Sequence, residues 1–415
     1  MSDQRKFGCV IICICLIAQL SGCGGTSSEK LPAQTSASST QNLPPTQAAV
    51  ANTVPVTVTN SIYGEVNTPY ISVTLCSPGS VTNCQTIDHI LLDTGSAGLR
   101  VYAVALNASL QLSPVTDVNG NPLAECMQFS EGYMWGPVRR ANLKMAGELV
   151  NNLAIQVVSD HSFSSMPDSC SATGQSLNTP QTFGANGVFG VGVFRQDCGS
   201  YCTQLNNIYF ACTSQNCQSS ALDINSQIQN PVSQFSSDNN GTIVSFDSMI
   251  NGSAANSLTG TLTFGIDTQA NNVSTNSHTL TADPTTGYIT TTVLGQNYAS
   301  SFFDTGSNAI LFNPPGYSLP MCANAPWYFC PATTTSFSAV SKGLNNVSAP
   351  IEFSAANAIL LFQTNPDFSA YPDLVGPVSG NDTFDWGMPF FFGRKVYTAI
   401  EGGTTTAGVG PYSGW

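Results

Sequence analysis

The chain has 415 residues, of which 42% are hydrophobic and only 8% are charged, and its formal net charge is −13 at pH 7. This length exceeds the roughly 100 to 150 residues of a typical domain, so two lobes are expected. The 11 Lys and Arg residues are too few for the clustered basic surface that nucleic-acid binding requires, which excludes that class of partner. The 36 Gly and 24 Pro residues favour short strands and turns, and therefore an all-β fold.

The first 23 residues have the features of an export signal. A basic start precedes an apolar stretch at residues 9–20 that is too short to span a bilayer comfortably. The stretch leads into LSGC at residues 20–23, which resembles a bacterial lipobox with Cys23 as the lipidated residue. The alternative is an ordinary secretory signal that contains a cysteine. We expect an exported protein, lipid-anchored in the outer membrane and facing the periplasm or the cell surface.

The remaining chain divides into a tether and a folded body. Residues 24–54 are rich in Ser, Thr, Gln, Ala and Pro and cannot bury enough surface to offset chain entropy, so they are predicted to be a disordered tether. The body is predicted to comprise an N-terminal β lobe at residues 55–240 and a C-terminal β lobe at residues 241–415. Alternating segments such as VPVTVTN at 54–60 and PYISVTL at 69–75 indicate strands. No long segment has a period of 3.6, so helices should be few and short.

The cysteines indicate disulfides in an oxidising compartment. Three pairs are close in sequence, namely Cys76 with Cys84, Cys212 with Cys217 and Cys322 with Cys330, although spacing does not determine connectivity. The alternative is a zinc site with four thiolates from Cys198, Cys202, Cys212 and Cys217. Disulfides are favoured because export brings the chain to a compartment that oxidises thiols, and no metal or other cofactor is expected. An even number of cysteines follows Cys23: Cys76, Cys84, Cys126, Cys170, Cys198, Cys202, Cys212, Cys217, Cys322 and Cys330.

The sequence DTGS occurs twice, at residues 93–96 and 304–307. A single copy in a β protein usually indicates a turn, because Asp, Gly and Ser are all turn formers. Here both copies follow two bulky apolar residues and precede another apolar run that begins three residues after the serine. The repeat therefore predicts two related halves, each of which presents one aspartate at the end of a strand to a shared site.

In these features the chain resembles the pepsin-like aspartic peptidases, whose two β lobes each present one DTG loop at a central cleft. Further segments match in the expected order: GVFGVGVF at 187–194 beneath the first loop, GTLTFGID at 260–267, and WGMPFFFGRKVYTAIEG at 386–402 beneath the second loop. The segment from Cys126 to Gly147 resembles the hairpin flap that closes over the substrate. The chain also resembles a bacterial group of secreted lipoproteins known only as a domain of unknown function.

The resemblance implies an endopeptidase that acts on peptides or unfolded proteins, as a monomer. Two carboxyl groups about 3 Å apart cannot both ionise easily, so one keeps a proton while the other activates a water molecule. Asp93 and Asp304 would form this catalytic pair. The supporting residues implied by the resemblance would be the threonines that link the loops, the glycines that offer backbone amides and the serines that donate to the outer carboxylate oxygens: Thr94, Thr305, Gly95, Gly306, Ser96 and Ser307.

Two departures from the family support a second hypothesis. Phe129 aligns with the flap tyrosine of the family, and Tyr133 and Trp135 lie near that position but not at it. All three could instead be aromatic residues that pack within a hairpin. Arg100 occupies the position where the family tends to carry a tryptophan. The alternative to an enzyme is therefore a catalytically inactive binding or scaffolding lipoprotein that retains the two-lobed cleft.

Overall fold

The computed structural model describes residues 52–59, 63–163, 166–213, 216–249, 253–316 and 319–415. The predicted signal, Cys23 and nearly all of the predicted tether lie outside these residues. The tether prediction is wrong at its end, because Thr53 and Val54 belong to the first strand and pair with Thr263 and Leu262. The alternation that begins at Thr53 continues through the strand and supplies the buried face that a disordered segment lacks. No helix in the described part of the chain is long and apolar enough to cross a bilayer.

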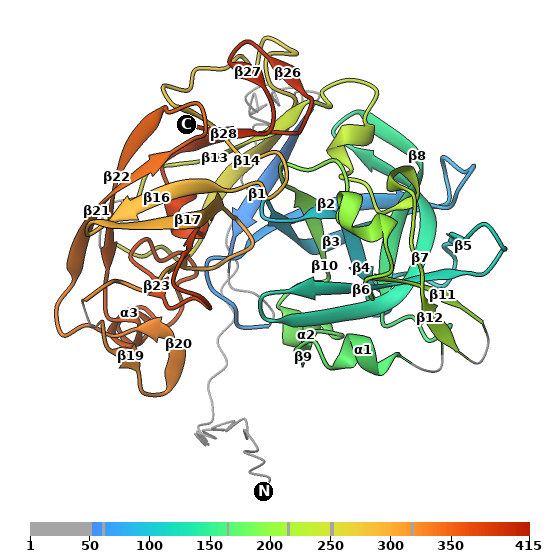
Figure 1. Cartoon of the computed structure of the whole chain (residues 1–415), viewed down its shortest axis with the longest axis horizontal. Helices are drawn as coiled ribbons and strands as arrows, with labels where there is room; N and C mark the ends of the chain where they lie inside the picture. The colour runs from blue at the N-terminus through green and yellow to red at the C-terminus, as the bar shows by residue number, and fades with distance from the viewer. Residues whose placement is uncertain (1–51, 60–62, 164–165, 214–215, 250–252, 317–318) are drawn as a thin grey trace, which may run out of the picture. The chain divides into compact units, whose positions relative to one another are not determined.

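Strands dominate the structure, as the composition predicts, and Figure 1 shows two groups of them with further strands in between. The intervening strands come from widely separated parts of the chain, since β1 pairs with β14, β14 with β13 and β13 with β25. They are β1 (Thr53–Val58), β13 (Gly241–Phe246), β14 (Leu258–Phe264), β15 (Thr279–Thr281), β25 (Lys395–Ala399) and β28 (Tyr412–Gly414).

The first group is formed by the chain between β1 and β13. Its strands are β2 (Pro69–Cys76), β3 (Cys84–Asp93), β4 (Ala97–Tyr102), β5 (Ser113–Pro114), β6 (Leu123–Phe129), β7 (Gly132–Met145), β8 (Glu148–Val158), β9 (Gln175–Ser176), β10 (Gly187–Val191), β11 (Tyr209–Cys212) and β12 (Cys217–Ser219). The strand predicted at residues 69–75 is confirmed as β2. Two four-residue helices lie in this half, α1 (Asp168–Ser171) and α2 (Pro180–Phe183).

The second group contains a sheet of seven strands. They are β16 (Ile289–Val293), β17 (Gln296–Phe303), β18 (Ile310–Leu311), β21 (Thr335–Lys342), β22 (Ser348–Ala355), β23 (Val375–Gly376) and β24 (Thr383–Trp386). Two small ribbons, β19 (Met321–Cys322) with β20 (Ala325–Phe329) and β26 (Thr404–Thr405) with β27 (Gly408–Val409), and helix α3 (Ala358–Thr364) complete the described strands and α-helices. The three α-helices of the described residues contain four, four and seven residues, which confirms that helices are few and short.

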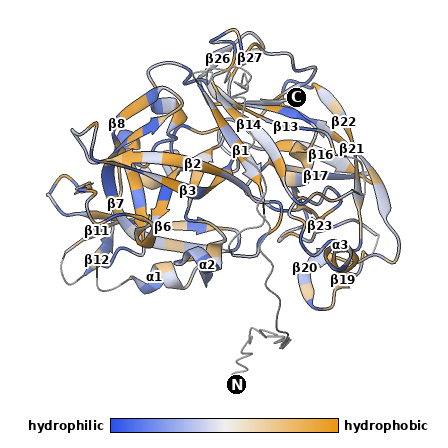
Figure 2. Ribbon diagram, turned by 180° about the vertical axis from the view of Figure 1, so that it is seen from behind, coloured by the Kyte–Doolittle hydropathy of each residue, from blue (hydrophilic) through white to orange (hydrophobic). Residues whose placement is uncertain are grey.

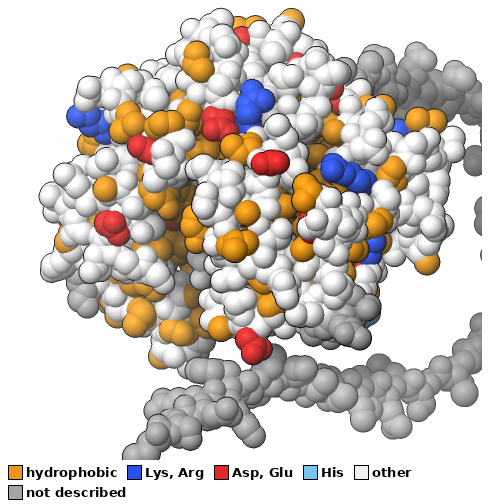
Figure 3. Space-filling view, turned by 45° about the vertical axis from the view of Figure 1, so that its right-hand side comes forward, with side chains coloured by type: hydrophobic (Ala, Val, Ile, Leu, Met, Phe, Trp, Pro, Cys, Tyr) orange, Lys and Arg blue, Asp and Glu red, His pale blue; other side chains and the backbone are white. Residues whose placement is uncertain are grey.

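Side-chain alternation explains why these segments form strands. Val54, Val56 and Val58 of β1 are buried, whereas the residues between them are at least partly exposed. Strand β21 alternates in the same way along most of its length. Figure 2 shows hydrophobic and hydrophilic positions interleaved along the ribbons of both halves. In Figure 3, uncharged side chains and backbone make up most of the visible face, and only scattered acidic and basic side chains interrupt them, in keeping with the low content of charged residues.

The same three-strand arrangement occurs once in each half. In the first half, β10 pairs in parallel with β3 and in antiparallel with β4, the strands on either side of the first DTGS loop. In the second half, β24 pairs in parallel with β17 and in antiparallel with β18, the strands on either side of the second loop. The predicted position beneath the first loop is thereby confirmed for residues 187–191. Beneath the second loop it is confirmed for the start of the segment at 386–402, because Trp386 and Met388 are hydrogen-bonded to Asp304 and Ser307, whereas Lys395–Ala399 pairs with β13. The fold is the all-β, two-lobed arrangement that the repeat predicts.

All ten cysteines of the described residues form disulfides. The three predicted local pairs are confirmed. The zinc alternative is wrong, because Cys198 pairs with Cys202 and Cys212 with Cys217, which uses all four of the proposed thiolates. Within the described residues, no three His, Cys, Asp or Glu side chains are grouped so that they could hold a metal ion. The fifth disulfide, Cys126–Cys170, joins strand β6 to helix α1.

Candidate active site

The two DTGS loops are joined by reciprocal hydrogen bonds between their threonines. The Thr94 backbone amide donates to Thr305 Oγ1 at 3.1 Å, and the Thr305 amide donates to Thr94 Oγ1 at 3.0 Å. Each hydroxyl in turn donates to a backbone carbonyl of the other half, Thr94 to Phe303 at 3.0 Å and Thr305 to Leu92 at 2.7 Å. Both threonines are buried, so the four bonds are shielded from water. They fix the two loops relative to each other.

Each aspartate is held by its own loop. Asp93 Oδ1 accepts hydrogen bonds from the Gly95 amide at 2.7 Å and the Ser96 amide at 3.1 Å, while Ser96 Oγ donates to Asp93 Oδ2 at 2.5 Å. Asp304 has equivalent contacts. Its Oδ1 accepts from the Gly306 amide at 2.6 Å and its Oδ2 accepts from Ser307 Oγ at 2.8 Å. The structure thus gives the six residues around the two acids the hydrogen bonds that the resemblance implies.

The glycines allow the two acids to approach each other. A Cβ atom on Gly95 would lie 2.6 Å from Asp304 Cγ, and a Cβ atom on Gly306 would lie 3.0 Å from Asp93 Cγ. Any side chain at either position would therefore displace the aspartate of the opposite half. With glycine at both positions, the carboxyl groups of Asp93 and Asp304 come within hydrogen-bonding reach of each other. Two acids separated by 211 residues form one pair.

This environment favours a proton on Asp304. Part of the Asp304 surface remains open to solvent, but the surrounding protein removes most of its hydration, and this burial is the largest cause of a pKa raised well above the usual range. The neighbouring carboxyls of Asp93 and Asp385 raise the pKa further, whereas the hydrogen bond from Ser307 opposes the shift. A pair that holds one proton is the state that general acid–base chemistry requires.

A third acid, Asp385, lies near the pair and was missed in the sequence. It is the third residue of β24, one position before the segment at 386–402, and its exposed fraction is 3%. Burial is the main cause that raises the pKa of Asp385 to about 8; the charges of Asp93 and Glu131 add to the shift and Ser307 opposes it. One feature of the sequence could have identified Asp385, namely an acidic residue within the apolar segment TFDWG of a chain that has few charges.

The predicted flap is a hairpin of β6 and β7, with Phe129 opposite Gly132 at its turn. Phe129 lies 5.9 Å from the ring of Phe183. Tyr133 and Trp135 are buried in an apolar cluster that contains the disulfide Cys126–Cys170. Their contacts favour the interpretation that these two aromatics pack within the hairpin.

A cavity of about 300 Å³ adjoins the first loop and extends to both halves of the molecule. Thr94, Gly95 and Ser96 form part of its wall, and Met127 of the flap strand β6 forms another part. From the second half come Phe302 and Tyr288, whose rings stack with centroids 5.9 Å apart. The cavity therefore has a partly apolar and aromatic wall next to the residues that follow Asp93, and neither acid of the pair lines it.

The comparisons with known proteins identify a family but no activity. A family model described as "Protein of unknown function (DUF3443)" matches residues 48–415, which is most of the chain. The chain belongs to the DUF3443 family. None of the curated proteins matches it by sequence. Among solved structures, the aspartic proteinase from Irpex lacteus is similar, with a TM-score of 0.49 and 15% sequence identity over 88% of this chain and 96% of that chain.

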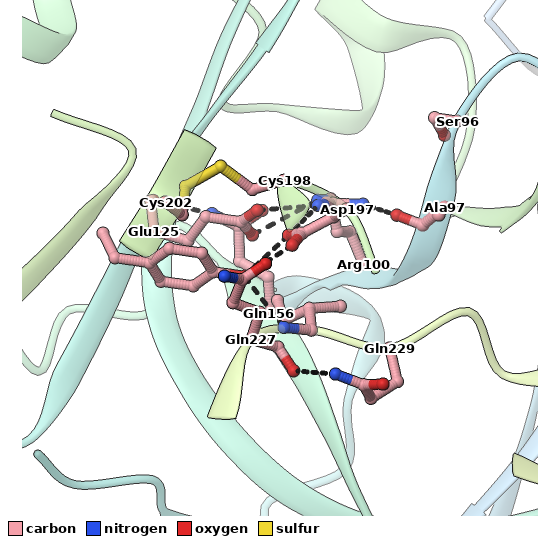
Figure 4. A network of polar contacts seen from close by, with 12 residues as sticks. Ser96, Ala97, Arg100, Glu125, Gln156, Asp197, Cys198, Cys202, Gln227 and Gln229 are labelled. Carbon is pink, nitrogen blue, oxygen red and sulfur yellow. Dashed lines mark hydrogen bonds and ion pairs between the residues drawn. A yellow bond between two sulfur atoms is a disulfide. The ribbon is translucent and has the colours of Figure 1, made fainter. Parts of the chain in front are cut away.

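In this DUF3443 protein, Arg100 is the centre of a buried charge network behind the first loop (Figure 4). Its Nη2 atom lies 2.6 Å from Glu125 Oε1 and 2.9 Å from Asp197 Oδ2, and all three side chains have at most 1% exposure. Its Nη1 donates to the carbonyl of Ala97, the residue that follows the DTGS sequence. Tyr209 donates its hydroxyl to Asp197. The arginine that replaces the expected tryptophan thus connects the first loop to the flap strand through Glu125.

Proposed function

We propose that this protein is an aspartic-type endopeptidase that hydrolyses peptide bonds through Asp93 and Asp304. The observation that supports the proposal is the pairing of two carboxyls from opposite halves, each hydrogen-bonded by the glycine amide and the serine hydroxyl of its own loop. A turn that served the fold alone would not need two acids brought together.

The arrangement supports a proton-balanced hydrolysis. The ionised carboxyl takes a proton from a water molecule as its oxygen attacks the peptide carbonyl carbon, and the protonated carboxyl donates its proton to the carbonyl oxygen. The resulting tetrahedral diol then releases its nitrogen as an amine, which receives a proton from the pair while the diol oxygen returns one. The raised pKa of Asp304 means that the pair keeps a proton at a pH at which an isolated aspartate would be ionised.

The substrate we propose is an extended peptide or an unfolded protein. The cavity beside Thr94, Gly95 and Ser96 can accommodate an apolar side chain, because Met127, Phe302 and Tyr288 provide much of its wall. A bound chain would lie beneath the β6–β7 hairpin. This position would exclude water from the peptide bond and strengthen the electrostatic contacts of the pair.

Substitution of either acid tests the proposal. Purified protein should cleave an unfolded protein substrate at some pH between about 3 and 7, and Asp93→Asn or Asp304→Asn should lower the rate at least about 10³-fold, because each removes one partner of the acid–base pair. Asp382→Asn, at an exposed position, is the matched control and should keep full activity. Cleavage that persists in either variant of the pair, or no cleavage by the unaltered protein throughout this pH range, would contradict the assignment.

A binding or scaffolding protein is the second candidate, favoured by one observation, namely that Tyr133 and Trp135 face an apolar cluster in the flap. Pepstatin, which mimics the tetrahedral intermediate, discriminates between the two. An enzyme should bind it in a manner that is lost in Asp304→Asn. A binder without turnover should capture its protein partner equally well with Asp93→Asn, Asp304→Asn and the unaltered chain.

We also propose that the protein is exported and anchored by a lipid on Cys23, which would hold the catalytic body beside a membrane. Five disulfides among the described residues support an oxidising compartment. In a bacterial host supplied with a labelled fatty acid, the unaltered chain should incorporate the label and sediment with membranes, whereas Cys23→Ala should do neither. Equal labelling of both chains would show that Cys23 is not the anchored residue.

A further inference from the structure

The position of Asp385 relative to the second loop is fixed by the backbone. Strand β24 runs parallel to β17, with Asp385 beside Phe302 and the next residue, Trp386, beside Phe303. The Asp304 amide donates to the Trp386 carbonyl at 3.1 Å. Asp385 therefore adjoins the residue whose backbone holds the second catalytic acid in place.

Ser307 lies between the two acids. Its hydroxyl donates to Asp304 Oδ2 at 2.8 Å, and its proximity to Asp385 opposes the rise in the pKa of Asp385. A serine hydroxyl carries a single proton. Because this proton is donated to Asp304 Oδ2, an ionised Asp385 would compete with Asp304 for it. The Oδ1 atom of Asp385 is buried and has no partner among the described groups, and a neutral carboxyl also suits this surrounding better than a carboxylate.

The fold does not require an acid at this position. Strands β10 and β24 occupy equivalent places in the two halves. The pairing of β10 with β3 can therefore be compared, residue by residue, with the pairing of β24 with β17. Phe189 and Trp386 are equivalent, and the residues that precede them are Val188 and Asp385. Val188 is fully buried in an apolar cluster. The first half fills the site with a hydrocarbon side chain, whereas the second half places a carboxyl there.

Acidic groups surround Asp385. The charged side chains that act on it are Asp93 and Asp304 of the catalytic pair and Glu131 at the turn of the flap. Arg394, a basic side chain of the same half, donates to the Phe390 carbonyl, and Arg100 of the other half pairs with Glu125 and Asp197. Negative charge on the neighbouring carboxyls opposes the ionisation of Asp304 and of Asp385.

We propose that Asp385 is a positioning residue that sets the upper pH limit at which the pair of Asp93 and Asp304 keeps its shared proton. The proposal rests on the function assigned above. In its neutral form, Asp385 does not compete with Asp304 for the proton of the Ser307 hydroxyl. Once Asp385 ionises, its charge repels a second negative charge on the pair and thereby delays loss of the shared proton. Without Asp385, the pair would lose this proton at lower pH.

The matched variants are Asp385→Asn and Asp382→Asn. Asparagine at residue 385 keeps the shape and a donor for Ser307 but cannot ionise, and Asp382 is an exposed acid three residues away. We expect the alkaline limb of the pH–rate profile to move down by about one pH unit in Asp385→Asn, which corresponds to an about tenfold lower rate at a fixed pH on that limb. The acid limb should not move, and Asp382→Asn should match the unaltered protein.

Carboxyl ¹³C NMR of protein labelled at aspartate provides a readout that needs no turnover. The midpoint of Asp304 titration should fall in Asp385→Asn and stay unchanged in Asp382→Asn. A protein that cleaves nothing but shows this change would overturn the proposed function and leave the role of Asp385 in place. An Asp304 midpoint that is the same in Asp385→Asn and the unaltered protein would overturn the role of Asp385, whether or not the protein is active.

Discussion

Replacing Arg100 with methionine is expected to lower the free energy of unfolding by about 3 to 5 kcal/mol, because it leaves Glu125 and Asp197 buried without a cation. Burial tends to lower the pKa of Arg100, but its two acidic partners outweigh that effect and raise it. For Asp197, burial and then the charge of Glu125 raise the pKa, and Arg100 opposes them. Because methionine retains much of the apolar part of the arginine side chain, the decrease in unfolding free energy chiefly measures the effect of removing the positive charge.

The loss of unfolding free energy in Arg100→Met should increase as pH rises. Without Arg100, nothing offsets burial and the charge of Glu125, so the folded-state pKa of Asp197 lies further above its unfolded value and folding favours its protonated form. The variant therefore loses stability as pH rises from about 4 to 8. Denaturant unfolding at several pH values measures this. Arg139→Met is the matched control, because Arg139 forms a partly exposed pair with Asp160 that should contribute at most about 1 kcal/mol. Equal losses in the two variants would show that the Arg100 network is not important for stability.

Asp385→Asn is expected to make the protein more stable at neutral and mildly alkaline pH. The folded-state pKa of about 8 lies above the value of about 3.9 for an unfolded aspartate, so the unaltered protein loses stability as pH rises between these values. Asparagine does not ionise and avoids this loss. At about 1.4 kcal/mol per unit of pKa difference, the gain should be on the order of 4 kcal/mol near pH 7.

The measurement is the difference in unfolding free energy between Asp385→Asn and the unaltered protein from pH 4 to 8. The difference should be close to zero at pH 4, where both chains carry a neutral residue, and should increase with pH. Asp382→Asn should show no such trend, since that side chain is exposed. A difference that is constant over the whole range would mean that Asp385 keeps an ordinary pKa in the folded protein.

Local patterns were sufficient to predict much of the fold. The strands at 53–58 and 69–76 alternate in sequence, and the pairs Cys76–Cys84 and Cys322–Cys330 are separated by only eight residues. The DTGS loops were predictable for a different reason, because the same turn between apolar runs occurs twice. In each case a few neighbouring residues were enough to predict the feature.

Contacts between distant segments were not predictable in this way. The partners of Arg100 are 25 and 97 residues away in the chain, so its position in the sequence indicates a departure from the family but not what balances the charge. Likewise, the proximity of Asp385 to Asp304 depends on the parallel pairing of β24 with β17, in which partners such as Phe302 and Asp385 are 83 residues apart. The pair Cys126–Cys170 spans 44 residues and has no spacing that distinguishes it from other choices.

The reciprocal hydrogen bonds of Thr94 and Thr305 make the geometry of each DTGS loop depend on the other half of the molecule. Because each hydroxyl is bonded to a carbonyl across the boundary, neither loop reaches its final geometry until the opposite one has folded. Chemistry at the paired acids would then appear only in a chain whose halves have both completed folding and docked. A partly folded molecule would contain both aspartates but could not cleave other copies of the same chain.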